Sequence, residues 1–179
     1  MTRWALSERR IAPHVATALL VFAAPPAMAE VNPSHEQQLI GECIAKAAKG
    51  RIWLERTLWG LRDQEGGWVG AEIANTDDSH DLGPLQVNSW WIPRIAKATK
   101  RPPAVIRYWL QHDACFNVAA ARWIFLSGMT VTRDYWKAVG VYHSPTFWRQ
   151  RAYAVRVAGH MKRRFGHRVL APEGRIRSQ

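Results

Sequence analysis

The sequence predicts a mainly α protein, a single domain of about six to seven helices with one long irregular segment. Its 179 residues are 47% hydrophobic and 22% charged, a globular composition that excludes disordered and fibrous chains. Apolar residues recur with helical period along most of the sequence. Residues 66–88 interrupt that period with Gly, Asp, Asn and Ser. Together these observations give the fold class.

Seven segments carry the helical pattern. Leu39, Cys43 and Ala47 mark the first of them. Segment 114–126 is the most apolar, so we expect its helix to be central and buried on most faces, and to end at Gly128. The expected N-cap residues are Ser89, Asp113, Thr132 and Thr146. The predicted helices cover 35–49, 52–65, 90–100, 104–111, 114–126, 133–143 and 147–165.

The irregular segment 66–88 is the exception to the helical pattern, and it has room for a small β-hairpin. A loop of this length inside a compact domain is usually functional.

The N-terminus predicts export. Residues 1–29 combine a basic leader, a short apolar run over 15–24 and small residues at Ala27 and Ala29, which is typical of a cleaved secretory signal peptide. The apolar run is too short to span a bilayer comfortably, so an uncleaved membrane anchor is the weaker alternative. We therefore expect a periplasmic protein with no stable membrane insertion after cleavage. Its domain would cover 30–168 and be followed by a flexible basic tail over 169–179.

The formal net charge of +11 indicates an acidic partner: nucleic acid, an anionic membrane or an acidic polymer such as cell wall. Removing the leader takes away three basic residues and Glu8, which leaves +9. Export argues against nucleic acid, and the basic residues form no known nucleic-acid recognition motif.

Cys43 and Cys115 are the two cysteines of the chain. In an oxidising compartment an isolated pair favours a structural disulfide, with two buried free thiols as the alternative. The sequence evidence for metal binding is weaker, because His112 and Cys115 make one short pair with no second pair at ligand spacing. We predict neither a metal nor a cofactor.

Glu65 is the candidate catalytic residue. It stands at the end of an amphipathic helix, immediately before Gly66 and Gly67. The negative end of the helix dipole, and loss of hydration against Trp side chains, would favour its protonated form, which a general acid needs near neutral pH. The glycines let a bulky ligand approach the backbone. Nucleophile-elbow, P-loop and dinucleotide-binding signatures are absent from the sequence.

Four further segments follow Glu65 in a characteristic order, namely Asn75, Asp81-Leu82-Gly83-Pro84-Leu85-Gln86-Val87-Asn88 with Trp90-Trp91, Asn117, and Val141-Tyr142-His143-Ser144. Over about residues 40–160 this order resembles the lytic transglycosylase (SLT) domain, a goose-type-lysozyme-like family. The likeness is greatest to its small members associated with conjugation and secretion. It implies a lysozyme-like fold. The sequence departs from the family pattern at Gly66, where Ser is usual, at Pro84-Leu85, where Leu-Met is usual, and at His143, where Asn is usual.

The resemblance implies that Glu65 protonates the glycosidic oxygen between N-acetylmuramic acid and N-acetylglucosamine in peptidoglycan. Glu65 would then accept the proton of the muramic acid 6-hydroxyl as that oxygen closes onto C1, giving a 1,6-anhydro sugar. Contacts to the glycan strand are expected from Gln86, Asn88, Trp68, Trp90, Tyr142 and His143. Tyr142 has the alternative of a core residue. Asn117, in an apolar helix, is expected to tie the Gln86 loop to the core.

Two other functions remain open. One is a hydrolytic lysozyme in which Asp78 or Asp81 activates water, although capping of the turn before Gly83 is the favoured role of Asp81. The other is a non-catalytic periplasmic module that binds cell wall or an assembly partner. Components of a secretion or conjugation apparatus are further candidate partners, because the resembling family members make local gaps in the wall for such assemblies.

Overall fold

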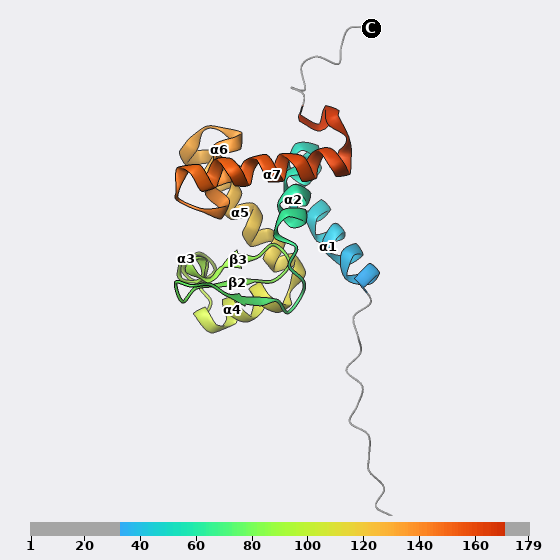
Figure 1. Cartoon of the computed structure of the whole chain (residues 1–179). Helices are drawn as coiled ribbons and strands as arrows, with labels where there is room; N and C mark the ends of the chain where they lie inside the picture. The colour runs from blue at the N-terminus through green and yellow to red at the C-terminus, as the bar shows by residue number, and fades with distance from the viewer. Residues whose placement is uncertain (1–32, 171–179) are drawn as a thin grey trace, which may run out of the picture. The chain divides into compact units, whose positions relative to one another are not determined.

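The computed structural model describes residues 33–170 and confirms the predicted mainly α class (Figure 1). Seven α-helices lie within this range, together with a small antiparallel sheet and two 3₁₀ turns. The arrangement is consistent with the predicted lysozyme-like domain. The helices are α1 (Pro33–Ala48), α2 (Ile52–Glu65), α3 (Ile92–Thr99), α4 (Pro103–His112), α5 (Ala114–Thr132), α6 (Tyr135–His143) and α7 (Phe147–Phe165).

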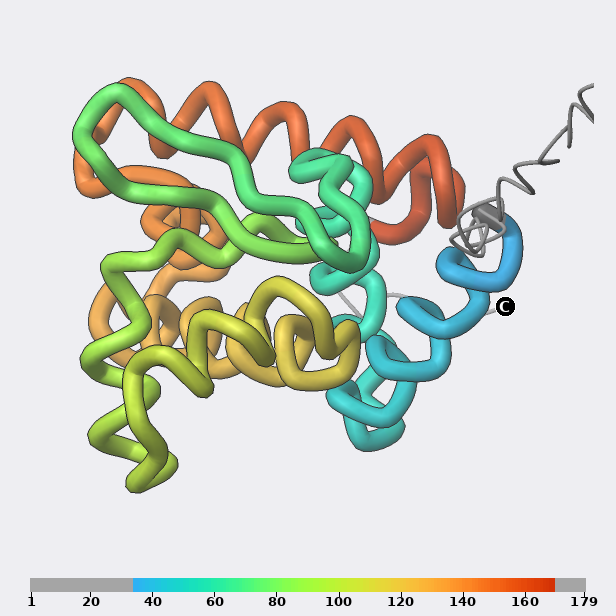
Figure 2. Tube along the Cα trace, turned by 90° about the horizontal axis from the view of Figure 1, so that it is seen from below, coloured from blue at the N-terminus to red at the C-terminus, as the bar shows by residue number. Residues whose placement is uncertain are grey.

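The irregular segment folds as three short antiparallel strands in the order β1-β2-β3. They are β1 (Glu72–Ala74), β2 (His80–Leu82) and β3 (Val87–Asn88). Glu72 pairs with Leu82, and Leu82 pairs with Val87. In Figure 2 the tip of the β1–β2 hairpin lies at the same end of the domain as the start of α7.

Helix α5 is central, as predicted. It packs against α1, α4, α6 and β3. Figure 1 shows α6 and α7 on one side of it and the sheet with α3 and α4 on the other. Its buried residues include Val118, Ala121 and Phe125, whereas Cys115 and Trp123 are exposed, so burial covers fewer faces than predicted. Of the described helices, α5 is the one whose length and apolar composition would also suit a membrane span.

The predicted disulfide between Cys43 and Cys115 is confirmed. It joins α1 to the first turn of α5, across 72 residues of sequence. The Cys43 side chain lies in the core with Ile40 and Ile44, whereas Cys115 reaches the surface. The bond therefore fixes the N-terminal helix to the central one.

The predicted end of α5 is wrong. The helix continues through Gly128 to Thr132 and ends where Arg133 adopts a positive φ of 52°. Gly128 is a buried position within the helix and lies next to Ala138 of α6, where even a Cβ would make only ordinary van der Waals contacts. Asp134, rather than Thr132, then caps α6: its Oδ1 accepts a hydrogen bond of 2.9 Å from the Lys137 N–H.

The other predicted caps had mixed outcomes. Asp113 caps α5 as expected, with Oδ1 accepting from the Phe116 N–H. Asn88, rather than Ser89, caps the 3₁₀ turn η1 (Ser89–Trp91) that precedes α3, because the Ser89 hydroxyl accepts from the His80 N–H instead. Thr146 stands at the N-cap of α7, but its side chain makes no capping hydrogen bond.

The predicted basic tail begins inside an ordered turn. Residues 169 and 170 belong to the 3₁₀ turn η2 (His167–Leu170), and Val169 packs against the core. Residues 171–179 of that tail and the predicted signal peptide, 1–29, lie outside the described residues.

Candidate active site

A cavity of about 580 Å³ opens between the sheet side of the domain and the end of α6. Glu65 lines it from the end of α2. The β1–β2 hairpin, the Gln86 loop, α6 and the α6–α7 connection supply much of the remaining lining. Two arginines also line it, Arg94 from α3 and Arg149 from α7.

Glu65 ends α2 because Gly66 takes a left-handed conformation, with φ 63°. The Gly66 N–H donates to the Arg62 carbonyl and closes the last turn. The pKa of the Glu65 carboxyl is raised from 4.5 to about 7, chiefly by burial and to a smaller extent by the charge of Asp81. A hydrogen bond from Tyr153 and the charge of Arg156 act in the opposite direction.

A tyrosine side chain contacts the Glu65 carboxyl directly. The Tyr153 hydroxyl on α7 donates a hydrogen bond to Glu65 Oε1. Burial, reinforced by the Glu65 charge, raises the pKa of Tyr153 well above its ordinary value, so the phenol stays protonated as a donor. His143 stacks in parallel on the Tyr153 ring, with centroids 4.6 Å apart, and Tyr142 stacks on it at 6.5 Å.

Tyr153 was not among the site residues predicted from the sequence. A signal was present, because Tyr153, Val157 and Met161 recur every four residues on a helix otherwise crowded with arginine, and all three are buried. That spacing identifies an inward face. It does not identify Glu65, 88 residues earlier, as the partner.

Tyr142 lines the cavity, but its hydroxyl points to the backbone and donates a 2.8 Å hydrogen bond to the Leu85 carbonyl. It therefore holds the loop that precedes Gln86. Asn117, on α5, holds the same loop, as predicted. Its Oδ1 accepts a hydrogen bond from the Leu85 N–H, and its Nδ2 donates to the carbonyls of Leu82 and Leu110.

Gln86 lines the cavity with a positive φ of 47°, and its Nε2 donates to the Gly83 carbonyl at 2.8 Å. Gly67 packs directly against this turn. A Cβ on Gly67 would collide with the Gly83 carbonyl oxygen and lie 2.7 Å from Gln86 Nε2. Gly67 therefore allows the backbone of the Gly83–Gln86 turn to approach. The sequence had predicted the approach of a ligand at this position.

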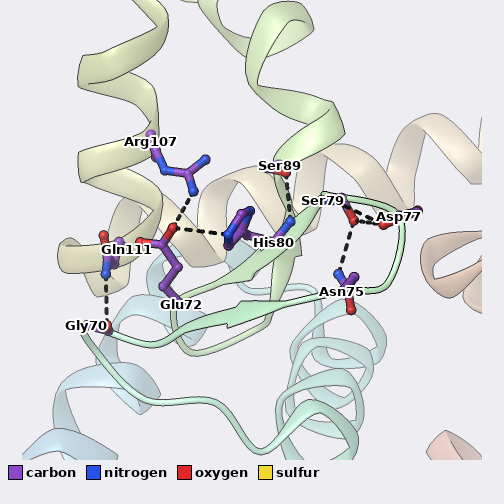
Figure 3. A network of polar contacts seen from close by, with 9 residues as sticks. All are labelled: Gly70, Glu72, Asn75, Asp77, Ser79, His80, Ser89, Arg107 and Gln111. Carbon is purple, nitrogen blue, oxygen red and sulfur yellow. Dashed lines mark hydrogen bonds and ion pairs between the residues drawn. The ribbon is translucent and has the colours of Figure 1, made fainter.

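Polar side chains stabilise the hairpin that borders the cavity. Ser79 is the centre of this network: its hydroxyl donates to Asp77 and accepts from Asn75 (Figure 3). Asn88 donates from its Nδ2 to both Ser79 Oγ and Asp81 Oδ1. At the other end of the hairpin, Figure 3 shows Glu72 between Arg107 and His80.

The remaining predicted residues divide into two groups. Asn88, His143 and Trp90 line the cavity, and the Trp90 side chain is 60% exposed beside it. Trp68 is also exposed but does not line the cavity, so its predicted glycan contact is not supported by its position.

The two aspartates proposed as water activators differ in their position relative to the cavity. Asp81 lines the cavity and bonds Asn88, in place of the expected turn cap. Asp78 stands exposed in the hairpin turn, with φ 61° and away from the lining.

The arrangement supplies a carboxyl group that carries a proton near neutral pH, inside a cavity rich in amide and aromatic side chains. Such a group can donate a proton to a leaving oxygen and take one back. In the described part of the chain, no three His, Cys, Asp or Glu side chains group closely enough to hold a metal ion. No protein-family model matches the chain, and no curated protein sequence matches it.

Proposed function

We propose that this protein is a peptidoglycan lytic transglycosylase in which Glu65 is both the catalytic acid and the catalytic base. The observation that carries the proposal is the raised pKa of the Glu65 carboxyl, about 7, inside a cavity of about 580 Å³ lined by polar side chains. A carboxyl with an ordinary pKa would have lost its proton at neutral pH. The proposal also rests on the resemblance of the surrounding segments to the SLT domain.

In the proposed reaction, the Glu65 carboxyl gives its proton to the glycosidic oxygen as the bond from that oxygen to C1 of N-acetylmuramic acid breaks. The Glu65 carboxylate then takes the proton of the 6-hydroxyl on the same sugar, and that oxygen bonds to C1. The products are a 1,6-anhydro sugar and a free 4-hydroxyl, and Glu65 is protonated again. No water is consumed, so a second carboxylate is not required.

Residues around Glu65 fit an acidic glycan substrate. Arg94 and Arg149 line the cavity and would attract the carboxylates of peptidoglycan stem peptides. Trp90 presents an exposed indole on which a sugar ring can stack. In the periplasm, such cleavage would open local gaps in the wall for a conjugation, secretion or pilus apparatus.

A hydrolytic lysozyme is the second candidate, because Asp81 lines the same cavity and its charge is near enough to raise the pKa of Glu65. In that reaction Asp81 would activate a water molecule instead of the sugar hydroxyl.

Mass analysis of muropeptides released from purified peptidoglycan separates these functions. We expect anhydro-ended products from the wild type and from Glu55→Gln, a control on α2 outside the cavity, and none from Glu65→Gln. Reducing ends, lost in both Glu65→Gln and Asp81→Asn, would establish the hydrolase instead. Absence of cleavage by the wild type would leave a wall-binding module.

A further inference from the structure

A second hollow, of about 540 Å³, lies between α6 and α7 on the side of α7 opposite Glu65. We call it the α6–α7 groove. On α7 its residues, among them Arg151, Ala154, Val155 and Ala158, face away from Tyr153, which turns toward Glu65. Its apolar walls are Trp136, Phe147, Ala154, Val155 and Ala158.

The walls of the groove are accessible apolar surface. Phe147 is 71% exposed and Val155 is 66% exposed, which is unusual for large apolar side chains that sit together in a hollow. Trp136 is partly exposed on the α6 side. A partner that covered these side chains would remove a continuous apolar area from water.

The groove has a fixed shape, because α6 and α7 cross in direct contact beside it. A Cβ on Gly140 would lie 2.6 Å from the Gln150 Cβ, so the two backbones approach as closely as glycine allows. Gln150 also closes the connection between the helices, since its Nε2 donates to the carbonyls of Ser144 and Pro145, both at 3.0 Å. A preformed groove needs little reorganisation to bind a ligand.

The charge around the groove selects its occupant. Lys137 and Arg151 line it, and α7 carries lysine and arginine but no acidic residue over its whole length. The one acidic residue in the lining, Asp134, is engaged as the N-cap of α6. A second copy of this chain, with a net charge of +11 before and +9 after removal of the leader, or its own tail with Arg175 and Arg177, would be repelled.

We propose that the α6–α7 groove binds an acidic amphipathic helix of a partner protein. Its apolar face would fill the groove, and its carboxylates would pair with Lys137 and Arg151. A flat anionic membrane surface fits less well, because it does not fill a hollow of about 540 Å³. Gln150 lines the groove and also holds Ser144 and Pro145, which line the Glu65 cavity, so the partner would contact a residue that shapes the cavity rim.

The test uses fluorescence anisotropy with a labelled helical peptide of about 18 residues, or five turns, with Leu and Phe on one face and Glu on the other. A peptide with Lys in place of Glu is the matched probe. We expect the acidic peptide to bind at least about tenfold more tightly than the basic one, as expected for close interfacial charge pairs. Arg151→Glu should weaken binding by a similar factor, whereas Arg163→Glu, the same change on α7 outside the groove, should not.

The apolar contribution is tested with Phe147→Ala, which should weaken binding several-fold, against Val131→Ala, an exposed apolar position outside the groove. These side chains are exposed, so the fold should survive, and circular dichroism checks it. Equal binding of the two peptides, or equal effects of groove and control variants, would overturn the proposal. A third result would also overturn it: the protein binds phosphatidylglycerol vesicles and not the acidic peptide, and the groove variants abolish the vesicle binding.

Docking in the groove does not depend on chemistry at Glu65. The Glu65→Gln variant keeps the groove and should bind the acidic peptide as tightly as the wild type does. Peptide binding without glycan cleavage would therefore reject the proposed function alone, and cleavage without peptide binding would reject the groove alone.

Discussion

The Tyr153 hydroxyl on α7 donates a hydrogen bond to Glu65 Oε1 at the end of α2. The contact joins two helices that are 88 residues apart in sequence, so α7 sets the environment of the candidate catalytic carboxyl. Burial at this site raises the pKa of Glu65, while the Tyr153 bond stabilises the ionised form and lowers it. The pKa of about 7 is the balance of these effects.

The first prediction concerns the pH dependence of activity. If Glu65 must be protonated to act, kcat/KM for glycan cleavage should fall as pH rises through about 7. In Tyr153→Phe the carboxylate loses its donor, so the pKa of Glu65 should rise and the falling limb should move to higher pH. Tyr135→Phe removes a partly buried phenol that is hydrogen-bonded to Thr57 and does not line the cavity, so it should leave the limb in place. A limb that stays near pH 7 in Tyr153→Phe would contradict this account.

The second prediction concerns stability. The pKa of Glu65 is raised in the folded state, so ionisation costs the native protein stability once the pH exceeds the unfolded value of 4.5, and fully so above about 7. The cost at pH 8 is about 3 kcal/mol. Glu65→Gln removes it and keeps an oxygen that accepts from Tyr153. The variant should therefore be more stable than the wild type at pH 8 and nearly equal at pH 4, in urea titrations at the two pH values. Equal stability at pH 8 would show that the folded-state pKa of Glu65 is not raised.

Helical periodicity was sufficient to predict the main elements of the fold. The helix 147–165 was predicted with its observed bounds, and 52–65 likewise. The caps were harder, because Thr132 and Asp134 are both good capping residues and the backbone path between α5 and α6 decides which one is used. The three-stranded pairing of 66–88 depends on Asn117, which lies on α5 and contacts the segment only in the folded chain.

The site was predictable where the signal is local and not where it is distant. Glu65 stands out in the sequence because a helix end and two glycines coincide there. Tyr153 does not, since its partner is on another helix. Trp68 was predicted to contact the glycan but does not line the cavity, because an aromatic side chain in a loop gives no information about the side of the loop it occupies.

The third prediction compares the two glycines after Glu65. Gly66 has a positive φ and open space around it, so Gly66→Ala should cost about 1 kcal/mol of backbone strain and leave the cavity intact. Gly67→Ala has no such strain but would place a methyl group against Gly83 and Gln86, so it should cost more and displace the Gln86 loop. Chemical denaturation gives both costs, and the Gln86 side-chain amide resonance reports the displacement. A larger loss of stability in Gly66→Ala than in Gly67→Ala would be inconsistent with this packing.

The fourth prediction concerns Asn117, which is fully buried and forms hydrogen bonds with three backbone groups. In Asn117→Ala the Leu85 N–H and the carbonyls of Leu82 and Leu110 lose these bonds where water does not reach, so unfolding free energy should fall by about 3–5 kcal/mol. Asn75→Ala, which removes an amide with one bond to Ser79 at the partly exposed hairpin, should cost less than about 1.5 kcal/mol. Urea unfolding followed by tryptophan fluorescence measures both.

Asn117 also positions the loop that carries Gln86. The KM of the proposed reaction should therefore rise more in Asn117→Ala than in Asn75→Ala. Similar destabilisation by the two variants would mean that solvent reaches the Asn117 site and that the loop is held by other contacts, chiefly the bond from Tyr142 to Leu85.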